Sequence, residues 1–265
     1  MDLISRLAVA EDVATRAGGL ARRYFEHRDT LTIEAKRTLQ DMVSEADREV
    51  ETLIRETLSQ EFAADAQLGE EHGLREGTSG LTWVIDPIDG TAPFLAGLPG
   101  WCVSIAVCDE TGPIIGVIHA PMLEETFVSA QGQGAWLNGE AIRVTERFDL
   151  STGLLGIGAN DRVPSARVGE MLAELMAAGA SWTRYGSGAL MLAWVAAGRL
   201  VGYAEPSMSA WDCMAGYCLI EAAGGQVLPF QSLTKAGPVL GACPAAYDDV
   251  LRLTRLDDDT VWGVR

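Results

Sequence analysis

The sequence lacks the patterns of several protein classes. No apolar run approaches the ~20 residues that a membrane-spanning helix needs. Residues 1–6 contain neither the basic region nor the apolar region of a signal peptide. The cysteines are odd in number, five, and form no C-x-x-C pair, so neither a zinc knuckle nor a disulfide framework is expected. We therefore expect a soluble, cytoplasmic protein with buried free thiols in a reducing compartment.

Basic residues are also scarce. Of the 265 residues, 20 are Lys or Arg and 37 are Asp or Glu, which gives a formal net charge of −17. Nucleic-acid backbones and anionic membranes are bound by basic surfaces, so we expect neither as a main partner. A phosphorylated substrate stays compatible with this charge, because bound metal cations reverse its sign inside an acidic site.

The glycine-rich stretches lack the motifs of nucleotide-binding folds. No Walker lysine is present, and no G-x-G-x-x-G segment follows a predicted strand. Ser187 lies in a Gly-Ser-Gly segment that lacks the G-x-S-x-G form of a hydrolase nucleophile. We expect Ser187 to begin a helix instead.

The hydrophobic pattern predicts a mixed α/β protein. With 48% hydrophobic and 22% charged residues, the chain is typical of a globular protein. Helical spacing predicts helices over residues 3–26, from about 44 onward, and over 166–178, 189–197 and 211–223. Short apolar runs predict strands over 81–85, 102–107, 114–119, 126–130 and 141–144, with hairpin turns at 109–112 and 138–139. This order indicates a layered α/β architecture with two lobes, 1–148 and 149–265.

Two acidic residues occupy an unusual place in this pattern. Asp86 and Asp89 follow the apolar strand 81–85 and precede Gly90-Thr91. Paired carboxylates that leave a buried strand lie at the C-terminal edge of a sheet, where α/β folds bind ligands. Like charges so close together repel each other unless a cation lies between them. The pair therefore predicts a metal site.

Three further acidic clusters support this prediction. They are Asp41–Asp47 at the start of the second helix, Glu70-Glu71 after Gly69, and Asp212 after Trp211. Helix capping is an alternative role for Asp41 and Asp212. An all-oxygen donor set favours Mg²⁺ or Mn²⁺ over zinc or copper. Such sites suit displacement at phosphorus, with one metal on the attacking water and another on the leaving oxygen.

The segment after Asp89 has the features of a helix start. Its free N–H groups and the positive end of the helix dipole form an anion site beside the carboxylates. Pro93 is compatible with a first helical turn, because its missing N–H costs nothing there.

Four motifs resemble those of the inositol monophosphatase superfamily of metal-dependent, lithium-sensitive phosphatases. They are DMVSEAD at 41–47, GEE at 69–71, WVIDPIDGT at 83–91, and WDCMAG at 211–216 followed by EAAGG at 221–225. With Lys36, which matches a lysine often found upstream of the first motif, they span the chain from 36 to 225. The resemblance implies an αβαβα sandwich and a homodimer.

The resemblance also implies roles for individual residues. The ligands of two or three Mg²⁺ ions, with Mn²⁺ as a substitute, would be Glu70, Asp86, Asp89, Asp212 and the Ile88 carbonyl. The residues that orient and deprotonate the attacking water would be Glu70, Thr91 and Asp47. The contacts to the phosphate and the rest of the substrate would come from Asp89, Gly90, Thr91, Ser187, Gly188, Glu205 and Asp212.

One segment departs from the family pattern. Residues 92–94 read Ala-Pro-Phe where inositol monophosphatases usually read Thr-Asn-Phe. We expect a Mg²⁺-dependent phosphomonoesterase that hydrolyses a small polyol phosphate, such as myo-inositol monophosphate, with metal-activated water. A phosphatase for histidinol phosphate or another small metabolite is the first alternative. A metal-binding regulatory protein without turnover is the second.

Overall fold

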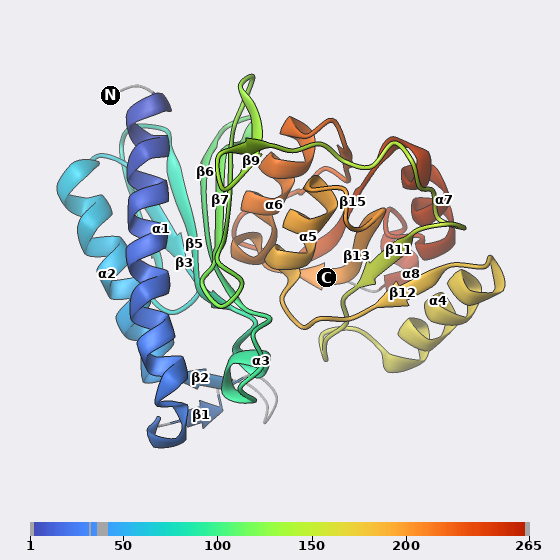
Figure 1. Cartoon of the computed structure of the whole chain (residues 1–265), viewed down its shortest axis with the longest axis horizontal. Coiled ribbons are helices and arrows are strands. Elements are labelled where there is room, and N and C mark those ends of the chain that lie inside the picture. The colour runs from blue at the N-terminus through green and yellow to red at the C-terminus, as the bar shows by residue number, and fades with distance from the viewer. Residues whose placement is uncertain (1–2, 32, 36–41, 263–265) are drawn as a thin grey trace.

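The structure is a computed structural model that describes residues 3–31, 33–35 and 42–262. It forms five layers, which alternate between helices and sheets (Figure 1). The main helices are α1 (Leu3–Glu26), α2 (Glu45–Glu61), α4 (Ser165–Ala177), α5 (Gly188–Ala196), α6 (Ala210–Ala222) and α7 (Pro244–Thr254). Shorter helices are the 3₁₀ turn η1 (Arg28–Thr30), α3 (Thr91–Leu95) and α8 (Asp259–Trp262).

The first large sheet has eight strands in the order β10-β9-β8-β7-β6-β5-β3-β4. Its strands are β3 (Ala66–Gly69), β4 (Gly73–Arg75), β5 (Thr82–Asp89), β6 (Cys102–Asp109), β7 (Gly112–Ala120), β8 (Glu125–Ala130), β9 (Gly134–Leu137) and β10 (Glu140–Ala141). Only β3 and β5 pair in parallel within it. A separate small hairpin joins β1 (Ile33–Ala35) to β2 (Met42–Ser44).

The second large sheet has five strands in the order β12-β11-β13-β15-β14. Its strands are β11 (Leu154–Ile157), β12 (Ser181–Thr183), β13 (Gly202–Met208), β14 (Gln226–Val227) and β15 (Gly237–Ala242). The predicted boundary at residue 148 falls between the two sheets. It stays a prediction, because α6 comes from the second half of the chain and packs on both sheets.

The layers confirm the predicted αβαβα sandwich. Helices α1 and α2 cover one face of the eight-stranded sheet, α5 and α6 lie between the two sheets, and α7 covers the far face of the smaller one (Figure 1). Since α5 and α6 are covered on both sides, apolar residues surround their whole circumference. Helix α1, with one covered face, instead buries a stripe of small residues at helical spacing, Ala10, Val13, Ala14, Ala17 and Ala21.

Most predicted elements are confirmed, and one is wrong. Helices α4, α5 and α6 each begin and end one residue before the predicted bounds. The predicted strand 141–144 is wrong, because pairing ends at Ala141, and the Val144 N–H donates to the Ala223 carbonyl at 3.1 Å instead. No range was predicted for β3, β4 or β9, for any strand of the second sheet, or for α7. All five cysteines are free and buried, as predicted.

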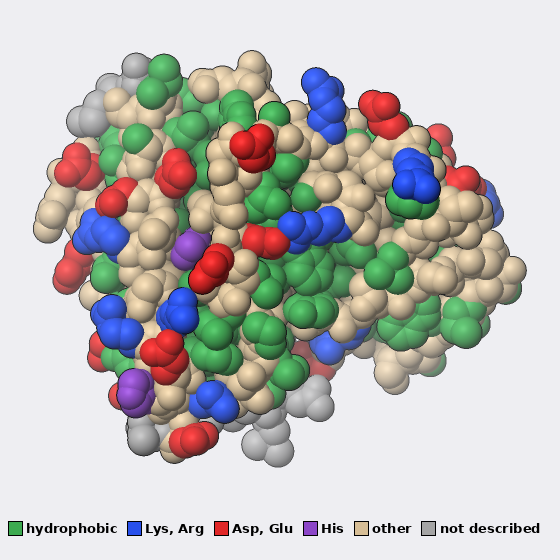
Figure 2. Space-filling view, viewed as in Figure 1, with side chains coloured by type: hydrophobic (Ala, Val, Ile, Leu, Met, Phe, Trp, Pro, Cys, Tyr) green, Lys and Arg blue, Asp and Glu red, His purple; other side chains and the backbone are tan. Residues whose placement is uncertain are grey.

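On the face in Figure 2, Lys and Arg side chains are scattered among acidic ones. Within the described residues, no helix is both long and apolar enough to cross a membrane.

Helix α6 lies directly against the backbone of the eight-stranded sheet. A methyl group at Gly116 in β7 would come 2.4 Å from the Ala215 carbonyl oxygen in α6. Only glycine permits this close approach of α6 to the sheet.

We predict that Gly116→Ala lowers the free energy of unfolding by about 1–3 kcal/mol, the usual cost of overpacking. Urea denaturation measures this change. Gly169→Ala is the matched control, since nothing lies within 4 Å of a methyl group there. Because Gly169 lies within α4, its replacement by alanine should raise the free energy of unfolding by about 0.5–1 kcal/mol. Equal stability of the Gly116 variant and the wild type would contradict the packing argument.

Candidate active site

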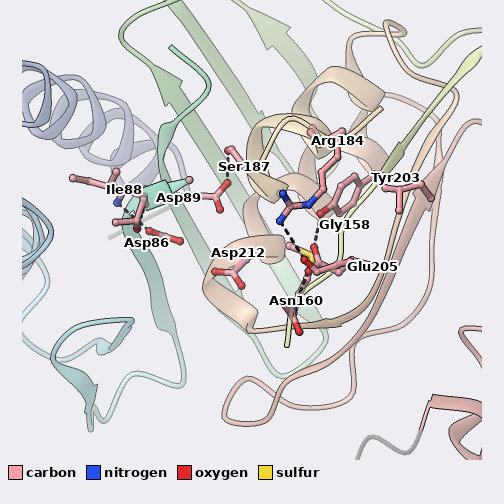
Figure 3. Close-up of a pocket in the computed structure, with 18 of the residues that line it drawn as sticks. Asp86, Ile88, Asp89, Gly158, Asn160, Arg184, Ser187, Tyr203, Glu205 and Asp212 are labelled. Atoms are coloured by element: carbon pink, nitrogen blue, oxygen red, sulfur yellow. Dashed lines mark hydrogen bonds between the residues drawn. The ribbon is translucent and has the colours of Figure 1, made fainter. Parts of the chain in front are cut away.

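The end of β5 is irregular where its two acidic residues lie. Asp86 pairs with Ser104 in β6 and Asp89 with Cys102, so three steps along β5 match two along β6. Residues three apart on a regular strand point to opposite faces, whereas a bulge re-aims the side chains that follow it. As a result, Asp86 and Asp89 line the same cavity (Figure 3). Pro87 is tolerated in this strand because it falls at the bulge.

Glu70 lies beside Asp86 because β3 runs parallel to β5. Gly69 pairs with Ile85, and the Glu70 N–H donates to the Ile85 carbonyl at 3.2 Å. The carboxyl ends of parallel strands meet at one edge of a sheet, so the two acidic residues line the same cavity.

Asp212 comes from the first turn of α6 and lies close to Asp86 and Asp89 (Figure 3). Ser209, not Asp212, is the N-cap residue, but the Ser209 N–H donates to Asp212 Oδ2 at 3.1 Å. The capping alternative is therefore partly correct, and it is compatible with a place in the site. The positive end of the helix dipole stabilises this carboxylate.

These carboxylates form a compact cluster. One oxygen each of Asp86, Asp89 and Asp212 lies within 4.8 Å of the other two. Burial, followed by repulsion from Glu70 and from Asp89, raises the pKa of Asp86 well above its usual range. Burial and the charges of Asp89 and Glu70 do the same for the pKa of Asp212. Among the described residues, no basic side chain forms an ion pair with these three aspartates.

A divalent cation fits this cluster. The donors are all oxygens, which are the ligands that Mg²⁺ prefers, and a positive charge would cancel the repulsion that raises the pKa values. The residues that could hold the ion are Glu70, Asp86, Asp89, Asp212 and the Ile88 carbonyl, all on the same cavity.

Asp89 also connects the end of β5 to the start of α5. Its Oδ2 atom accepts hydrogen bonds from Ser187 Oγ at 2.5 Å and from the Ala189 N–H at 2.7 Å. Burial raises the pKa of Asp89, and these two donors act against that rise. Ser187 also caps α5 by accepting from the Leu190 N–H at 3.3 Å, which confirms its predicted helix-start role. Its hydroxyl proton points to Asp89, and its contact with a substrate stays a prediction.

Thr91 lines the cavity beside the carboxylate cluster, and its hydroxyl lies near Asp47. Thr91 Oγ1 is 3.4 Å from Asp47 Oδ1 and 3.3 Å from the Ile88 carbonyl oxygen, and it can donate to either. Asp47 is buried in the first turn of α2. Gly90 is the N-cap of α3 with a φ of 97°, a left-handed conformation that favours glycine.

The far wall of the cavity is polar. Glu205 on β13 accepts hydrogen bonds from the Tyr203 hydroxyl at 2.5 Å and from Asn160 Nδ2 at 2.9 Å (Figure 3). Burial raises the pKa of Glu205 to about 7, although both bonds lower it. Gly188 and Arg184 line the same wall, and the cavity measures about 190 Å³.

Sequence reasoning missed Asn160, Tyr203 and Arg184 as lining residues. No motif marks them, and they reach the cavity only because β11, β13 and the segment before α5 meet there. The three histidines lie elsewhere: His27 is exposed, His119 bonds Thr126 Oγ1 at 2.9 Å, and His72 contacts Glu51. Lys36 and Asp41 lie outside the described residues.

The comparisons with known proteins agree with this geometry. The model of the inositol monophosphatase family matches residues 2–247. This chain belongs to that family. Family relatives include inositol monophosphatase 1 of Solanum lycopersicum, 36% identical over 83% of this chain and 82% of that protein. Another is the Nus factor SuhB of Haemophilus influenzae, 32% identical over 94% of this chain and 95% of that protein.

Solved structures of family members share the fold. An IMPase from Thermotoga maritima superposes with a TM-score of 0.85 at 27% identity, covering 97% of this chain and 99% of that chain. The extragenic suppressor protein suhB from Bartonella henselae superposes with a TM-score of 0.86 at 30% identity, covering 95% and 98%.

The raised carboxyl pKa values predict how stability depends on pH. A carboxyl group whose pKa is higher in the folded state contributes stability that is lost as pH rises through that pKa. We therefore expect the metal-free protein to lose stability as pH rises above about 4, the usual carboxyl pKa. Asp86→Asn removes one of the repelling charges, so it should raise the metal-free Tm at pH 8 and reduce stabilisation by Mg²⁺.

Thermal unfolding with and without Mg²⁺ measures both effects. Each pKa unit by which the repulsion raises a carboxyl pKa corresponds to about 1.4 kcal/mol in the free energy of unfolding. Asp257→Asn, which removes an exposed carboxylate, is the control and should change neither quantity. The assignment of Asp86 as a metal ligand would be contradicted by two results together. The Asp86→Asn variant would be less stable than the wild type without metal, and Mg²⁺ would stabilise both proteins equally.

Proposed function

We propose that this protein is a Mg²⁺-dependent phosphomonoesterase that hydrolyses a small polyol phosphate. The observation that carries the proposal is the convergence of the Asp86, Asp89 and Asp212 carboxylates within 4.8 Å, beside Glu70, in one cavity. Bound Mg²⁺ supplies a Lewis acid for the phosphoryl oxygens and lowers the pKa of water. Membership of the inositol monophosphatase family supports the same reaction class.

The residues beside the carboxylates handle the attacking water. Thr91 and Glu70 orient it from two sides, and the proton passes through the Thr91 hydroxyl toward Asp47, which lies 3.4 Å away. General-base assistance of this kind contributes about 10²–10⁴ in rate. The amides of Gly90 and Thr91 donate to the phosphate, since the left-handed turn at Gly90 leads into the first turn of α3.

The opposite wall supports a polyol as the other half of the substrate. Glu205 is held in one orientation by Tyr203 and Asn160. Its carboxylate can accept hydrogen bonds from substrate hydroxyls, and Gly188 leaves room beside it. An ammonium group could also pair with Glu205, so histidinol phosphate stays the alternative substrate.

A binding role is the second candidate function. Relatives that are 32–37% identical to this chain carry the name Nus factor SuhB, and that name favours a role beyond hydrolysis as the second candidate. Asp47, Glu70, Asp86, Asp89 and Asp212 are all present here, which favours turnover. The homodimer and lithium sensitivity stay predictions from the resemblance, and the cytoplasmic location stays a prediction from the sequence.

We predict Mg²⁺-dependent phosphate release from a panel of inositol, sugar, histidinol and adenosine phosphates, with the inositol or sugar phosphates hydrolysed fastest. Release is measured with and without Mg²⁺, and after chelation with EDTA. Asp89→Asn should abolish turnover because it weakens the central ligand. Preference for histidinol phosphate would select the alternative substrate. If no member of the panel releases phosphate while the protein has metal bound, the result would favour the binding role over hydrolysis.

We also predict that Thr91→Ala lowers kcat by about 10²–10⁴, the contribution of one acid–base group. The apparent Mg²⁺ affinity should stay unchanged, because the Thr91 side chain is not a ligand. Steady-state kinetics over a range of Mg²⁺ concentrations separates the two effects. Thr78→Ala, at an exposed loop position, is the control. Wild-type kcat in the Thr91 variant would remove this residue from the mechanism.

A further inference from the structure

Glu51 is a buried acidic residue that the mechanism above does not use. It lies in the middle of α2, with 0% of its surface exposed. Glutamate is almost never fully buried unless its charge is paired. Its burial therefore needs a specific reason, and its neighbours supply one.

The Glu51 carboxylate binds the turn between β3 and β4. Its Oε2 atom accepts the Glu71 N–H at 2.7 Å, and its Oε1 atom accepts the His72 N–H at 3.2 Å. Oε1 also accepts from Arg55 Nη1 at 3.1 Å and lies 3.3 Å from His72 Nδ1. Arg55 in turn donates to the Gly73 carbonyl at 3.0 Å. One buried carboxylate thus fixes the backbone of the whole turn.

The same carboxylate touches the residue that precedes Glu70. A methyl group at Gly69 would come 2.1 Å from Glu51 Oε1, so a larger residue there would displace the Glu51 carboxylate. The Glu70 backbone is then held on three sides. Gly69 lies against Glu51, the Glu71 amide is bonded to Glu51, and the Glu70 N–H is bonded to Ile85 in β5.

We propose that Glu51 is a positioning residue that sets the metal affinity of the site by fixing the backbone of Glu70. The proposal rests on the proposed function, in which Glu70 is a metal ligand. A fixed backbone limits the positions that the Glu70 carboxylate can reach, which lowers the entropy cost of binding the ion. A glutamine at this position would carry one acceptor oxygen and one NH₂ group. The NH₂ group would face an N–H donor and displace the turn.

The test compares Glu51→Gln with Glu56→Gln. Glu56 lies on the exposed face of the same helix, so its replacement removes the same charge without touching the turn. Mg²⁺ binding is measured by calorimetry, independently of turnover, and kinetics give the Mg²⁺ concentration for half-maximal activity. We expect Glu51→Gln to weaken Mg²⁺ binding by about 10-fold or more, the usual effect of losing a group that supports a ligand. Glu56→Gln should bind Mg²⁺ as the wild type does.

A purely structural role would lower Tm and leave the Mg²⁺ affinity of the folded protein unchanged, and that result would overturn the proposal. If Glu51→Gln does not fold, the Gly69→Ala variant tests the proposal instead. Its methyl group disturbs the contact between residue 69 and the Glu51 carboxylate from the side of β3. It should weaken Mg²⁺ binding to a similar extent, and wild-type affinity in Gly69→Ala would overturn the proposal. Failure of the proposed function gives a different result: a wild type that binds Mg²⁺ but releases no phosphate. A wild type that binds no Mg²⁺ would overturn both.

Discussion

The repulsion within the carboxylate cluster around the end of β5 is the constraint on which the rest of the site depends. Asp86, Asp89 and Asp212 hold oxygens within 4.8 Å of one another. Burial and mutual repulsion raise the pKa of Asp86 and of Asp212, so in the absence of a cation the arrangement costs stability. A fold that keeps such a cluster must stabilise it elsewhere, and a small, hard cation would offset the repulsion.

The five layers supply that stabilisation by joining the site from both halves of the chain. The eight-stranded sheet contributes Asp86 and Asp89, while α6 contributes Asp212 from between the sheets. Asp89 is tied across the gap to Ser187 and to the first turn of α5. The close approach of α6 to Gly116 and the buried Glu51 carboxylate then fix two of the elements that carry the acids. Contacts from several elements therefore hold the acidic residues in place, as the proposed catalysis would require.

Much of this could be predicted from the sequence, because the signals are local. An apolar run followed by Asp86 and Asp89 predicts acidic residues at the end of a buried strand, although the strand does not stop at residue 85 as predicted but continues through Asp89. The helical spacing of α1 and α2 predicts their positions. The resemblance to the family motifs predicted that the remaining acidic residues lie in the same site. The strand at 141–144 could not be predicted correctly, because the Val144 N–H pairs with Ala223, a residue distant in sequence.

The residues that were missed depend on tertiary contacts. Asn160 and Tyr203 gain their role only when β11 and β13 bring them to Glu205. Glu51 falls within an amphipathic helix rich in acidic residues, where a single glutamate is typical of a solvated surface. Its burial follows from Gly69, which allows β3 to pass against it.

The most direct test of the central claim is a crystal structure of the protein with Mn²⁺ and inorganic phosphate, using the anomalous signal of manganese. The account predicts metal peaks within about 2.0–2.2 Å of oxygens of Asp86, Asp89 and Asp212, with phosphate beside the Gly90 and Thr91 amides. Manganese bound elsewhere, or a carboxylate cluster that stays free of metal at saturating concentration, would contradict it.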